Sequence, residues 1–502
     1  MQVALVALGI ISLLELVMWL PPLWHWHKPA AVILIAPLAF ASGLLVGERP
    51  TLWSFGILYI SLYRLINLLR VIEQRPHVDF LNMTGRRSSL LLIAGQALII
   101  GVWALDQHWH MALSWWLSIL VTGQLAGAVM LLTSTQRHLR TTHVSPLKQR
   151  YADRDLPTLT VAIPARNETD DLEACLNSLV SSNYPKLEIL VLDDCSQLKR
   201  TPEIIRGFAH DGVRFISGQA PPERWLAKNY AYKQLVEASS GEIVLFCGVD
   251  VRFQPGTLRS LVDVLLQKNK RMISLAPKNQ LPDGRSFDEL FPQPDRYAWE
   301  MALPRRFLNR PPVLSTCWLA YRETIDQAGG FGAVSQSISP ESYFAKWAVL
   351  HDDSYSFLRS DSEVGLTCTK SLSEQRATAV RTRYPQLHRR PELVSVVSLL
   401  ELSWLTLPFA MVVISAVMGQ WLIVVAALIN CILLVIFYAK IINFTYQRRG
   451  WVGGWLLPFA GLYDVAVLNY SMWRYEFNEV VWKDRNVCIP VMRVIPALPK
   501  QG

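Results

Sequence analysis

The chain has 502 residues, of which 51% are hydrophobic, 10% aromatic and 18% charged, and its mean hydropathy is +0.23. This composition excludes both an ordinary soluble protein and a chain wholly buried in a membrane, so aqueous and membrane parts must both be present. The net charge of +9 does not indicate nucleic-acid binding, because the basic residues flank hydrophobic runs, where anionic lipid headgroups explain them more simply.

Five hydrophobic runs near the start of the chain predict membrane-spanning helices, because each approaches the roughly 20 apolar residues that cross a bilayer. The runs are residues 2–20, 30–46, 52–69, 90–105 and 113–132. The first run is expected to remain as a helix, since it lacks the basic start and the small-residue cleavage site of a signal peptide. Lys and Arg gather between the third and fourth runs and after the fifth, and basic loops stay cytoplasmic. We therefore expect an N-terminal transmembrane region at residues 1–133 and a cytoplasmic domain after it.

The polar block at residues 134–392 is predicted to be an α/β domain. Short β-rich runs alternate there with helical stretches, and four of these runs are LTVAIP (159–164), LEILVLDD (187–194), VRFIS (213–217) and EIVLFC (242–247). Strands that are apolar on both faces and separated by helices indicate a mostly parallel sheet covered on both sides. Ligands of such sheets bind at the carboxyl ends of the strands.

The residues that follow these strands suggest a nucleotide site. Arg166 and Glu168 follow the first strand, and Asp193 and Asp194 end the second. Asp250 follows the fourth strand. Carboxylates accept hydrogen bonds from a base and a ribose, and an arginine binds phosphate. The alternative for the acidic residues after the first two strands is that they only cap the helices that follow.

A second apolar set begins after the polar block. Its runs are residues 402–418, 421–439 and 451–472. Gly461 and Asp464 interrupt the last run, which is therefore predicted to be re-entrant or interfacial. We expect a C-terminal transmembrane or re-entrant region at residues 393–475 and a cytoplasmic tail at residues 476–502.

Four segments occur in the order and spacing of a known family. They are VAIPARNE (161–168), LVLDDCS (190–196), PPERWLAKNYA (221–231) and STCWLAYRETIDQAGGF (315–331). Together they resemble membrane-anchored family 2 glycosyltransferases. Within that family they are most similar to the ceramide glucosyltransferase-like and hopanoid-associated enzymes. The resemblance implies an α/β nucleotide-diphospho-sugar transferase fold of the GT-A type, inserted between two sets of transmembrane helices.

The resemblance also implies donor-binding residues in the first two segments. Pro164, Arg166 and Glu168 match the nucleotide loop of the family. Asp193 and Asp194 match a turn that contacts uridine, in which Asp194 is favoured.

The third and fourth segments imply contacts to the diphosphate and the sugar. Lys228 matches a lysine near the diphosphate, and a cation at the positive N-terminal end of a helix is unfavourable unless an anion lies nearby. The position of Lys228 at a helix start therefore favours phosphate contact over a solvated lysine. The resemblance places Thr316, Cys317 and Trp318 beside the donor sugar on the acceptor side, as lining residues rather than catalysts.

One departure from the family pattern concerns the metal. The D-x-D carboxylate pair that holds Mg²⁺ or Mn²⁺ against the diphosphate is replaced here by Gly248, Val249 and Asp250. One carboxylate with two phosphates and water can still bind Mg²⁺, because that ion often keeps few protein ligands. A weakened divalent-cation site at Asp250 is therefore expected.

The second departure lies in ISPESYFAKWA (338–348), where the resemblance implies an Asp that deprotonates the acceptor hydroxyl. Glu341 is followed there by Ser342, which makes Glu341 the candidate catalytic base. The alternative is that a Glu at this point only stabilises the start of a helix. Asp352 and Asp353 are a rival pair, but their position before a short β-like run favours a turn.

Two segments further along the chain carry basic residues. VRTRYPQL (380–387) replaces the Q-x-x-R-W element of the family and looks like the arginine-rich segment of the hopanoid-associated branch. Arg381 and Arg383 are candidates to hold the departing diphosphate, or alternatively lipid headgroups. VWKDR (481–485) resembles a closing motif of Trp, Lys or Arg, Gly and Arg, and should lie in the cytoplasm.

The sequence therefore predicts an integral membrane protein of the bacterial cytoplasmic membrane that makes an envelope glycolipid. It would be an inverting glycosyltransferase that moves a sugar from a UDP- or GDP-type donor to a lipid or lipid-linked acceptor on the cytoplasmic face. A processive polysaccharide synthase is an alternative that the missing Q-x-x-R-W element disfavours. A catalytically degenerate nucleotide-binding scaffold for envelope glycan assembly is the other alternative, because Gly248 and Ser342 replace expected carboxylates.

Overall fold

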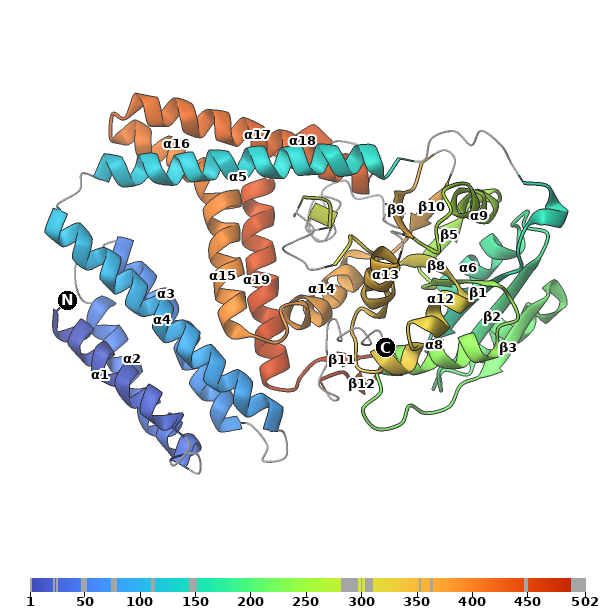
Figure 1. Cartoon of the computed structure of the whole chain (residues 1–502), viewed down its shortest axis with the longest axis horizontal. Helices are drawn as coiled ribbons and strands as arrows, with labels where there is room; N and C mark the ends of the chain where they lie inside the picture. The colour runs from blue at the N-terminus through green and yellow to red at the C-terminus, as the bar shows by residue number, and fades with distance from the viewer. Residues whose placement is uncertain are drawn as a thin grey trace.

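A computed structural model of the protein describes residues 2–20, 23, 26–46, 52–73, 79–109, 113–143, 151–280, 297–298, 300–302, 310–351, 354–361, 364–446 and 450–488. A bundle of four helices lies at one end, an α/β domain lies at the other, and α15 and α19 stand side by side between them (Figure 1). The helices of these groups are α1 (Gln2–Met18), α2 (His27–Val46), α3 (Leu52–Glu73), α4 (Asp79–Trp109), α15 (Pro391–Glu401) and α19 (Leu457–Glu476).

A seven-stranded sheet forms the centre of the α/β domain, in the order β3-β2-β1-β4-β8-β6-β9. The strands are β1 (Leu159–Ala165), β2 (Leu187–Asp193), β3 (Val213–Ser217), β4 (Ile243–Cys247), β6 (Met272–Ala276), β8 (Cys317–Tyr321) and β9 (Tyr355–Arg359). β1 to β4 are parallel to one another, β6 is parallel to β9, and β8 runs antiparallel to both of its neighbours. The four apolar runs of the sequence are β1 to β4, so the predicted mostly parallel sheet is confirmed.

Helices cover both faces of this sheet, and the sheet separates two hydrophobic cores. One face is covered by α6 (Asp170–Val180), α7 (Arg200–Gly207) and α9 (Thr257–Gln267), and the other by α8 (Ala227–Ala238), α12 (Arg322–Gln327) and α13 (Pro340–Leu350). Side chains alternate between the two cores along each strand, so that Leu245 packs in the first and Phe246 in the second. α6 shows why the helices dock, because Leu172, Cys175, Leu176 and Leu179 recur at helical spacing and are buried against the sheet.

The strand register determines where functional side chains collect. β1 pairs with β2 so that Ala165 lies opposite Asp193, and with β4 so that Ala162 lies opposite Phe246. The loops after these three parallel strands therefore leave the sheet at the same edge. Glu168, which follows β1, and the residues after β2 and β4 are gathered there from distant parts of the sequence.

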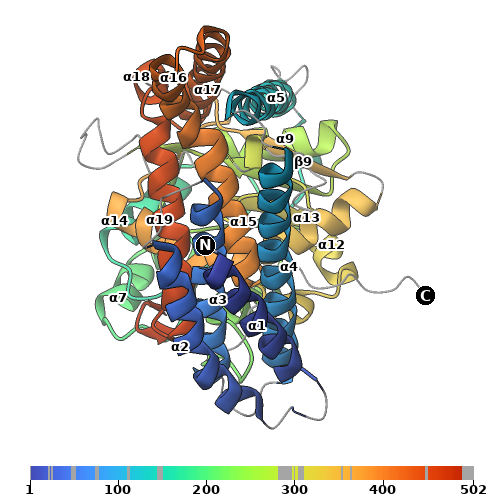
Figure 2. The same cartoon turned by 90° about the vertical axis from the view of Figure 1, so that its left-hand side faces the viewer.

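Three further helices lie across the ends of α15 and α19. α5 (Leu113–Thr141), α16 (Leu407–Val417) and α17 (Trp421–Thr445) pack side by side there (Figures 1 and 2). The chain turns between α15 and α16 at a π-helical segment, Leu402–Thr406, which is followed closely by Pro408. The changed hydrogen-bond spacing and the missing N–H of proline explain the bend.

Within the described residues, six helices are long and apolar enough to cross a membrane, judged by length and composition. They are His27–Leu45, Trp53–Ile72, Gly85–Gln107, Leu113–Thr141, Pro391–Val417 and Trp421–Thr445. Four precede the α/β domain in the chain and two follow it, which indicates a membrane protein with apolar helices on both sides of the domain. α1, with 17 residues, and α19, which contains Asp464, are outside this set.

The α/β domain is attached directly to the apolar helix α17. The core on the α8 face of the sheet continues into α17 through Leu434, Phe437 and Tyr438. The ammonium of Lys278 also donates hydrogen bonds to the main-chain oxygens of Asn443 and Phe444, at 2.7 and 2.8 Å, where α17 ends. These last oxygens of a helix lack partners within the helix, so the lysine satisfies them and joins the two parts.

Candidate functional site

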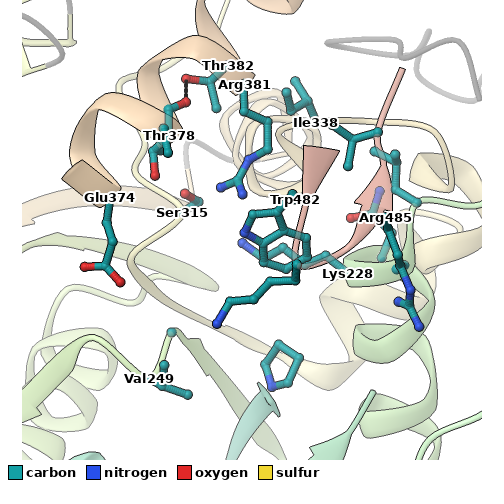
Figure 3. A pocket seen from close by; sticks show the side chains of 18 of the residues that line it. Lys228, Val249, Ser315, Ile338, Glu374, Thr378, Arg381, Thr382, Trp482 and Arg485 are labelled. Atoms are coloured by element: carbon teal, nitrogen blue, oxygen red, sulfur yellow. Dashed lines mark hydrogen bonds between the residues drawn. The ribbon is translucent and has the colours of Figure 1, made fainter. Parts of the chain in front are cut away.

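A cavity of about 710 Å³ lies at the edge where the carboxyl ends of β1 and β4 meet, and its volume is typical of small-ligand pockets. Its walls come from the loops after these strands, the first turn of α8, α14 (Leu372–Gln386) and a C-terminal hairpin of β11 (Val481–Trp482) and β12 (Arg485–Asn486). Figure 3 shows Glu374, Arg381 and Trp482 around this space. The predicted site residues that line it are Pro164, Glu168, Lys228, Asp250, Thr316 and Arg381.

One side of the cavity, here called the hairpin side, is formed by Glu168, Lys483 and Arg485, with Asp194 behind them. The ammonium of Lys483 lies 2.9 Å from Oε1 of Glu168, and Nη1 of Arg485 lies 2.6 Å from Oδ2 of Asp194. Burial raises the pKa of both carboxyls, and the two cations oppose that shift. The VWKDR segment, which resembles a closing motif, therefore packs on the predicted nucleotide loop.

Arg166 and Asp193 hold the loops of the hairpin side together rather than lining the cavity. Arg166 donates hydrogen bonds of 2.7 to 2.9 Å to the main-chain oxygens of Asp194, Cys195 and Lys483. The carboxylate of Asp193 accepts a hydrogen bond of 3.2 Å from the main-chain N–H three residues further on, which is a turn contact. Both residues position their neighbours.

The opposite side, here called the lysine side, consists of Lys228, Asp250 and Lys370. A small sheet of β5 (Val251–Phe253), β7 (Lys278–Asn279) and β10 (Leu366–Cys368) places Cys368 opposite Val251. One residue after β10, a main-chain N–H donates to the oxygen of Asp250 at 2.9 Å. The next residue is Lys370, whose ammonium lies 3.5 Å from Oδ2 of Asp250. The thiol of Cys368 donates to the same oxygen at 3.4 Å.

The charge of Asp250 is determined by these partners. Burial by itself would raise the pKa of the carboxyl, but the ammonium of Lys370 and the hydrogen bond from Cys368 hold the pKa below its usual value. Burial raises the pKa of the Cys368 thiol, so the thiol keeps its proton and remains a donor. Asp250 is therefore an ionised carboxylate that is already paired with a cation.

This arrangement does not fit the divalent cation expected at Asp250. Oδ1 of Asp250 lies over Gly248, where an added β-carbon would collide with it. Oδ2 faces Lys370 and accepts the Cys368 thiol. Among the residues that the structure describes, no three His, Cys, Asp or Glu side chains are grouped to hold a metal ion. A metal cation at Asp250 would also lie next to the ammonium of Lys370, and the two positive charges would repel each other.

Lys228 lies in the first turn of α8, as the sequence predicts, and lines the cavity. Its ammonium is 5.3 Å from the centroid of the Tyr232 ring. Burial lowers the pKa of Lys228 to about 8, and the nearby charge of Glu341 opposes that shift. An ammonium whose solvation is reduced in this way gains more from an anionic ligand than an exposed one.

The residues predicted on the acceptor side divide between the cavity and the core. Thr316, which precedes β8, lines the cavity, whereas Cys317 and Trp318 are fully buried in the two cores. The Trp318 ring stacks on Phe246 with 4.1 Å between centroids. Alternation along the strand explains why consecutive residues end in different places.

Glu341 lies in the first turn of α13 and is 4% exposed. It does not itself line the cavity, but Ser337 and Ile338, one turn earlier in the chain, do. Its negative charge opposes the lowering of the pKa of Lys228 by burial. The rival pair Asp352 and Asp353 lies outside the described residues.

Arg381 and Arg383 leave α14 in different directions. The Arg381 guanidinium lies over the Trp482 ring, 4.8 Å from its centroid, and lines the cavity (Figure 3). Arg383 is buried and pairs with Asp464 of α19. Residues two apart on a helix do not share a face, so the structure turns one arginine to the cavity and the other to the apolar helices.

The sequence motifs do not include Lys370 and assign no individual role to Lys483 and Arg485. Lys370 stands just before α14, whose first turn closes with a capping box of Ser371 and Glu374. A cation at a helix N-terminus is the signal that identified Lys228, and it applies equally to Lys370. The hairpin residues gave no such signal, because their partners lie about 300 positions earlier in the chain.

Comparisons with known proteins agree with the motif resemblance. Residues 160–325 match the family model described as Glycosyl transferase family 2. The chain is 36% identical over 99 residues to "Glycosyltransferase AglE" of Haloferax volcanii, which covers 19% of this chain and 31% of the relative. It is 30% identical over 118 residues to "Probable glycosyltransferase YdaM" of Bacillus subtilis, which covers 23% and 28%. The chain thus spans about a third of the length of these curated relatives, and the family 2 resemblance is confirmed for the α/β domain.

Among solved structures, the chain is similar to the mannosyltransferase PcManGT from Pyrobaculum calidifontis, solved in complex with GDP-Man and Mn²⁺. The TM-score is 0.42 with 16% identity, over 71% of this chain and 98% of that chain.

Proposed function

We propose that this chain, whose residues 160–325 form a family 2 glycosyltransferase domain, is a membrane-bound inverting glycosyltransferase. It takes a sugar from a UDP- or GDP-type donor and transfers it to a lipid or lipid-linked acceptor on the cytoplasmic face of a bacterial membrane. The observation that carries the proposal is the cavity at the carboxyl edge of the sheet, which basic side chains line and which α14 connects to the apolar helices. A scaffold that only binds nucleotide would not need this connection.

The cavity offers separate places for the two parts of a donor. Pro164 and Glu168, with Asp194 behind them, provide the loop for the base and ribose. Lys228 and Arg381 supply N–H donors and positive charge for the diphosphate. The sugar would then lie toward Thr316, where the wall formed by β8 begins.

Transfer requires a base on the acceptor side of the sugar. Glu341 would take the proton of the acceptor hydroxyl while its oxygen attacks the anomeric carbon from the face opposite the diphosphate. The bond between that carbon and the diphosphate oxygen breaks, and its electron pair stays on the leaving group. Lys228 and Arg381 stabilise the charge that develops there. Attack from the opposite face inverts the anomeric centre.

The position of α14 supports a lipid acceptor. Ala377, Thr378 and Arg381 of this helix line the cavity, while its other face packs on α19 and Arg383 pairs with Asp464. An amphipathic acceptor can therefore bring its headgroup to the sugar while its apolar part stays among the helices. The basic segments beside the hydrophobic runs support a cytoplasmic position for the domain.

The test is transfer of labelled sugar into lipid by the purified full-length protein. Radiolabelled UDP- and GDP-sugars are incubated with the protein and bacterial lipid extract, and label in the organic phase is measured. We expect one donor to give a labelled lipid whose anomeric configuration, read by NMR, is opposite to that of the donor. Nucleotide binding without any labelled lipid, with every common donor, would instead favour the scaffold. Inside-out and right-side-out vesicles, compared for donor access, test the cytoplasmic face.

A further inference from the structure

We propose that the ammonium of Lys370 takes the place of the divalent cation in this donor site, so that the diphosphate is bound by fixed side-chain cations and donor binding needs no metal. The inference rests on the proposed function, because it concerns how the same cavity holds its donor. It follows from the disagreement between the expected cation at Asp250 and the groups that surround this carboxylate.

The position of Lys370 is fixed by the fold rather than by a flexible surface contact. β10 pairs with β5, and the main-chain hydrogen bond that follows ties the chain to the oxygen of Asp250 at 2.9 Å. On the other side, the residue after Lys370 starts the capping box of α14. The lysine is thus held between a strand end and a helix start. Its ammonium lies 3.5 Å from Asp250, and the residue lines the cavity.

Gly248 supports the same conclusion from the opposite direction. The Asp250 carboxylate folds back over Gly248, so closely that any β-carbon there would collide with Oδ1. A side chain at position 248 would therefore require the Asp250 carboxylate to rotate out of the position in which it meets Lys370 and Cys368.

Replacing a carboxylate pair and its divalent cation by one carboxylate and one ammonium keeps the net charge of the site unchanged. A pair of carboxylates with a divalent cation sums to zero, and so does one carboxylate with one ammonium. The loss of the first carboxylate and the gain of a lysine therefore compensate each other. What the metal would give the phosphate oxygens, positive charge at short range, comes here from N–H donors.

Three of the cationic side chains that line the cavity lie away from the hairpin side and are available to the diphosphate. Lys228 enters from α8, Lys370 from the end of β10, and Arg381 from α14. They come from three different elements, so they can contact a diphosphate from different directions. A metal ion at Asp250 would have to displace the ammonium of Lys370 and remain beside it, which Coulomb repulsion disfavours.

The test is calorimetric titration of the full-length, detergent-solubilised protein with UDP and with GDP, in excess EDTA and again in excess MnCl₂. We expect one of the two nucleotides to bind with the same affinity within about twofold in both conditions. Lys370→Ala should weaken binding in EDTA by about ten- to a hundredfold, the effect of losing a charge-assisted hydrogen bond. Mn²⁺ should restore part of that loss, because the Asp250 carboxylate is then open to a cation.

Two variants keep the result interpretable if Lys370→Ala is unstable. Lys370→Arg keeps the positive charge and should bind in EDTA much more tightly than Lys370→Ala. Lys268→Ala, at the C-terminal end of α9 and outside the cavity-lining set, should bind like the unaltered protein. Binding that requires Mn²⁺ in the unaltered protein would overturn this inference and leave the proposed function standing. Binding of neither nucleotide in either condition would overturn both.

Discussion

The two sides of the cavity neutralise their carboxylates by different means. On the hairpin side, Glu168 and Asp194 receive Lys483 and Arg485 from a short C-terminal hairpin. On the lysine side, Asp250 receives Lys370 from a strand end within the same domain. The hairpin side thus depends on the docking of one small segment, whereas the lysine side is built into the sheet. The cavity therefore combines a hairpin from a distant part of the chain with a cation, Lys370, that is held by the domain itself. A mutation can remove either of them without removing the other.

The largest effect is expected from Glu341→Gln. This variant tests whether the sugar is transferred next to the lysine side. Loss of the candidate base should lower turnover by about a hundred- to ten-thousandfold. Nucleotide affinity, measured by calorimetry, should stay nearly unchanged because Glu341 lies outside the cavity lining. The matched control is Glu374→Gln, since Glu374 lines the cavity and glutamine preserves its capping box. If Glu374→Gln removes turnover and Glu341→Gln does not, the base is wrongly assigned.

Lys228→Met sharpens the comparison by removing a cation from the lysine side alone. We expect the affinity for the nucleoside diphosphate to fall about ten- to a hundredfold, because a desolvated charge-assisted contact is lost. The affinity for the corresponding nucleoside, which lacks the diphosphate, should not change. Calorimetric titration with both ligands measures the difference. Equal losses for the two ligands would mean that Lys228 contacts the base or ribose instead.

Raising the pH should weaken phosphate binding by the lysine side without any mutation. Burial lowers the pKa of Lys228 to about 8. Negative charge on Glu341 and Asp250 opposes this shift, and the nearby cations Arg381 and Lys370 add to it. The ammonium is therefore protonated below about pH 8 and loses its proton above that pH.

We expect the affinity for the nucleoside diphosphate to fall about tenfold between about pH 7.5 and pH 9. The phosphates are fully ionised throughout this range, so their own titration does not interfere. Lys228→Arg is the control, because its guanidinium stays charged, and its affinity should be nearly independent of pH. The same fall in Lys228→Arg would assign the titration to another group.

The smallest effect is expected from Arg485→Ala, which breaks the hairpin side. Asp194 would lose its partner at 2.6 Å, and the hairpin would dock less firmly on the nucleotide loop. We expect the nucleoside and its diphosphate to lose affinity by the same factor, about three- to tenfold. A loss confined to the diphosphate would mean that this side also contacts phosphate, and the distinction between the two sides would fail.

The sequence predicted the frame of the site better than its details. Pro164, Glu168 and Lys228 line the cavity at the edge of the sheet, and their places at strand ends and a helix start can be read from local patterns. Arg383 and Trp318 were grouped with residues that do line the cavity, yet they are buried elsewhere. One or two positions along a strand or helix change the face, and a motif does not report that difference.

The sequence by itself determined the mostly parallel sheet, the apolar helices on both sides of it and the family of the domain. Each depends on periodicity and short motifs, which are properties of neighbouring residues. Only the tertiary structure decided that Asp250 meets Lys370 and that Asp194 meets Arg485, 291 positions away. A charged residue carries no local record of its partner, because the pairing is created when strands and helices pack. The ionic character of this cavity is therefore a consequence of the fold, even though every charge in it is present in the sequence.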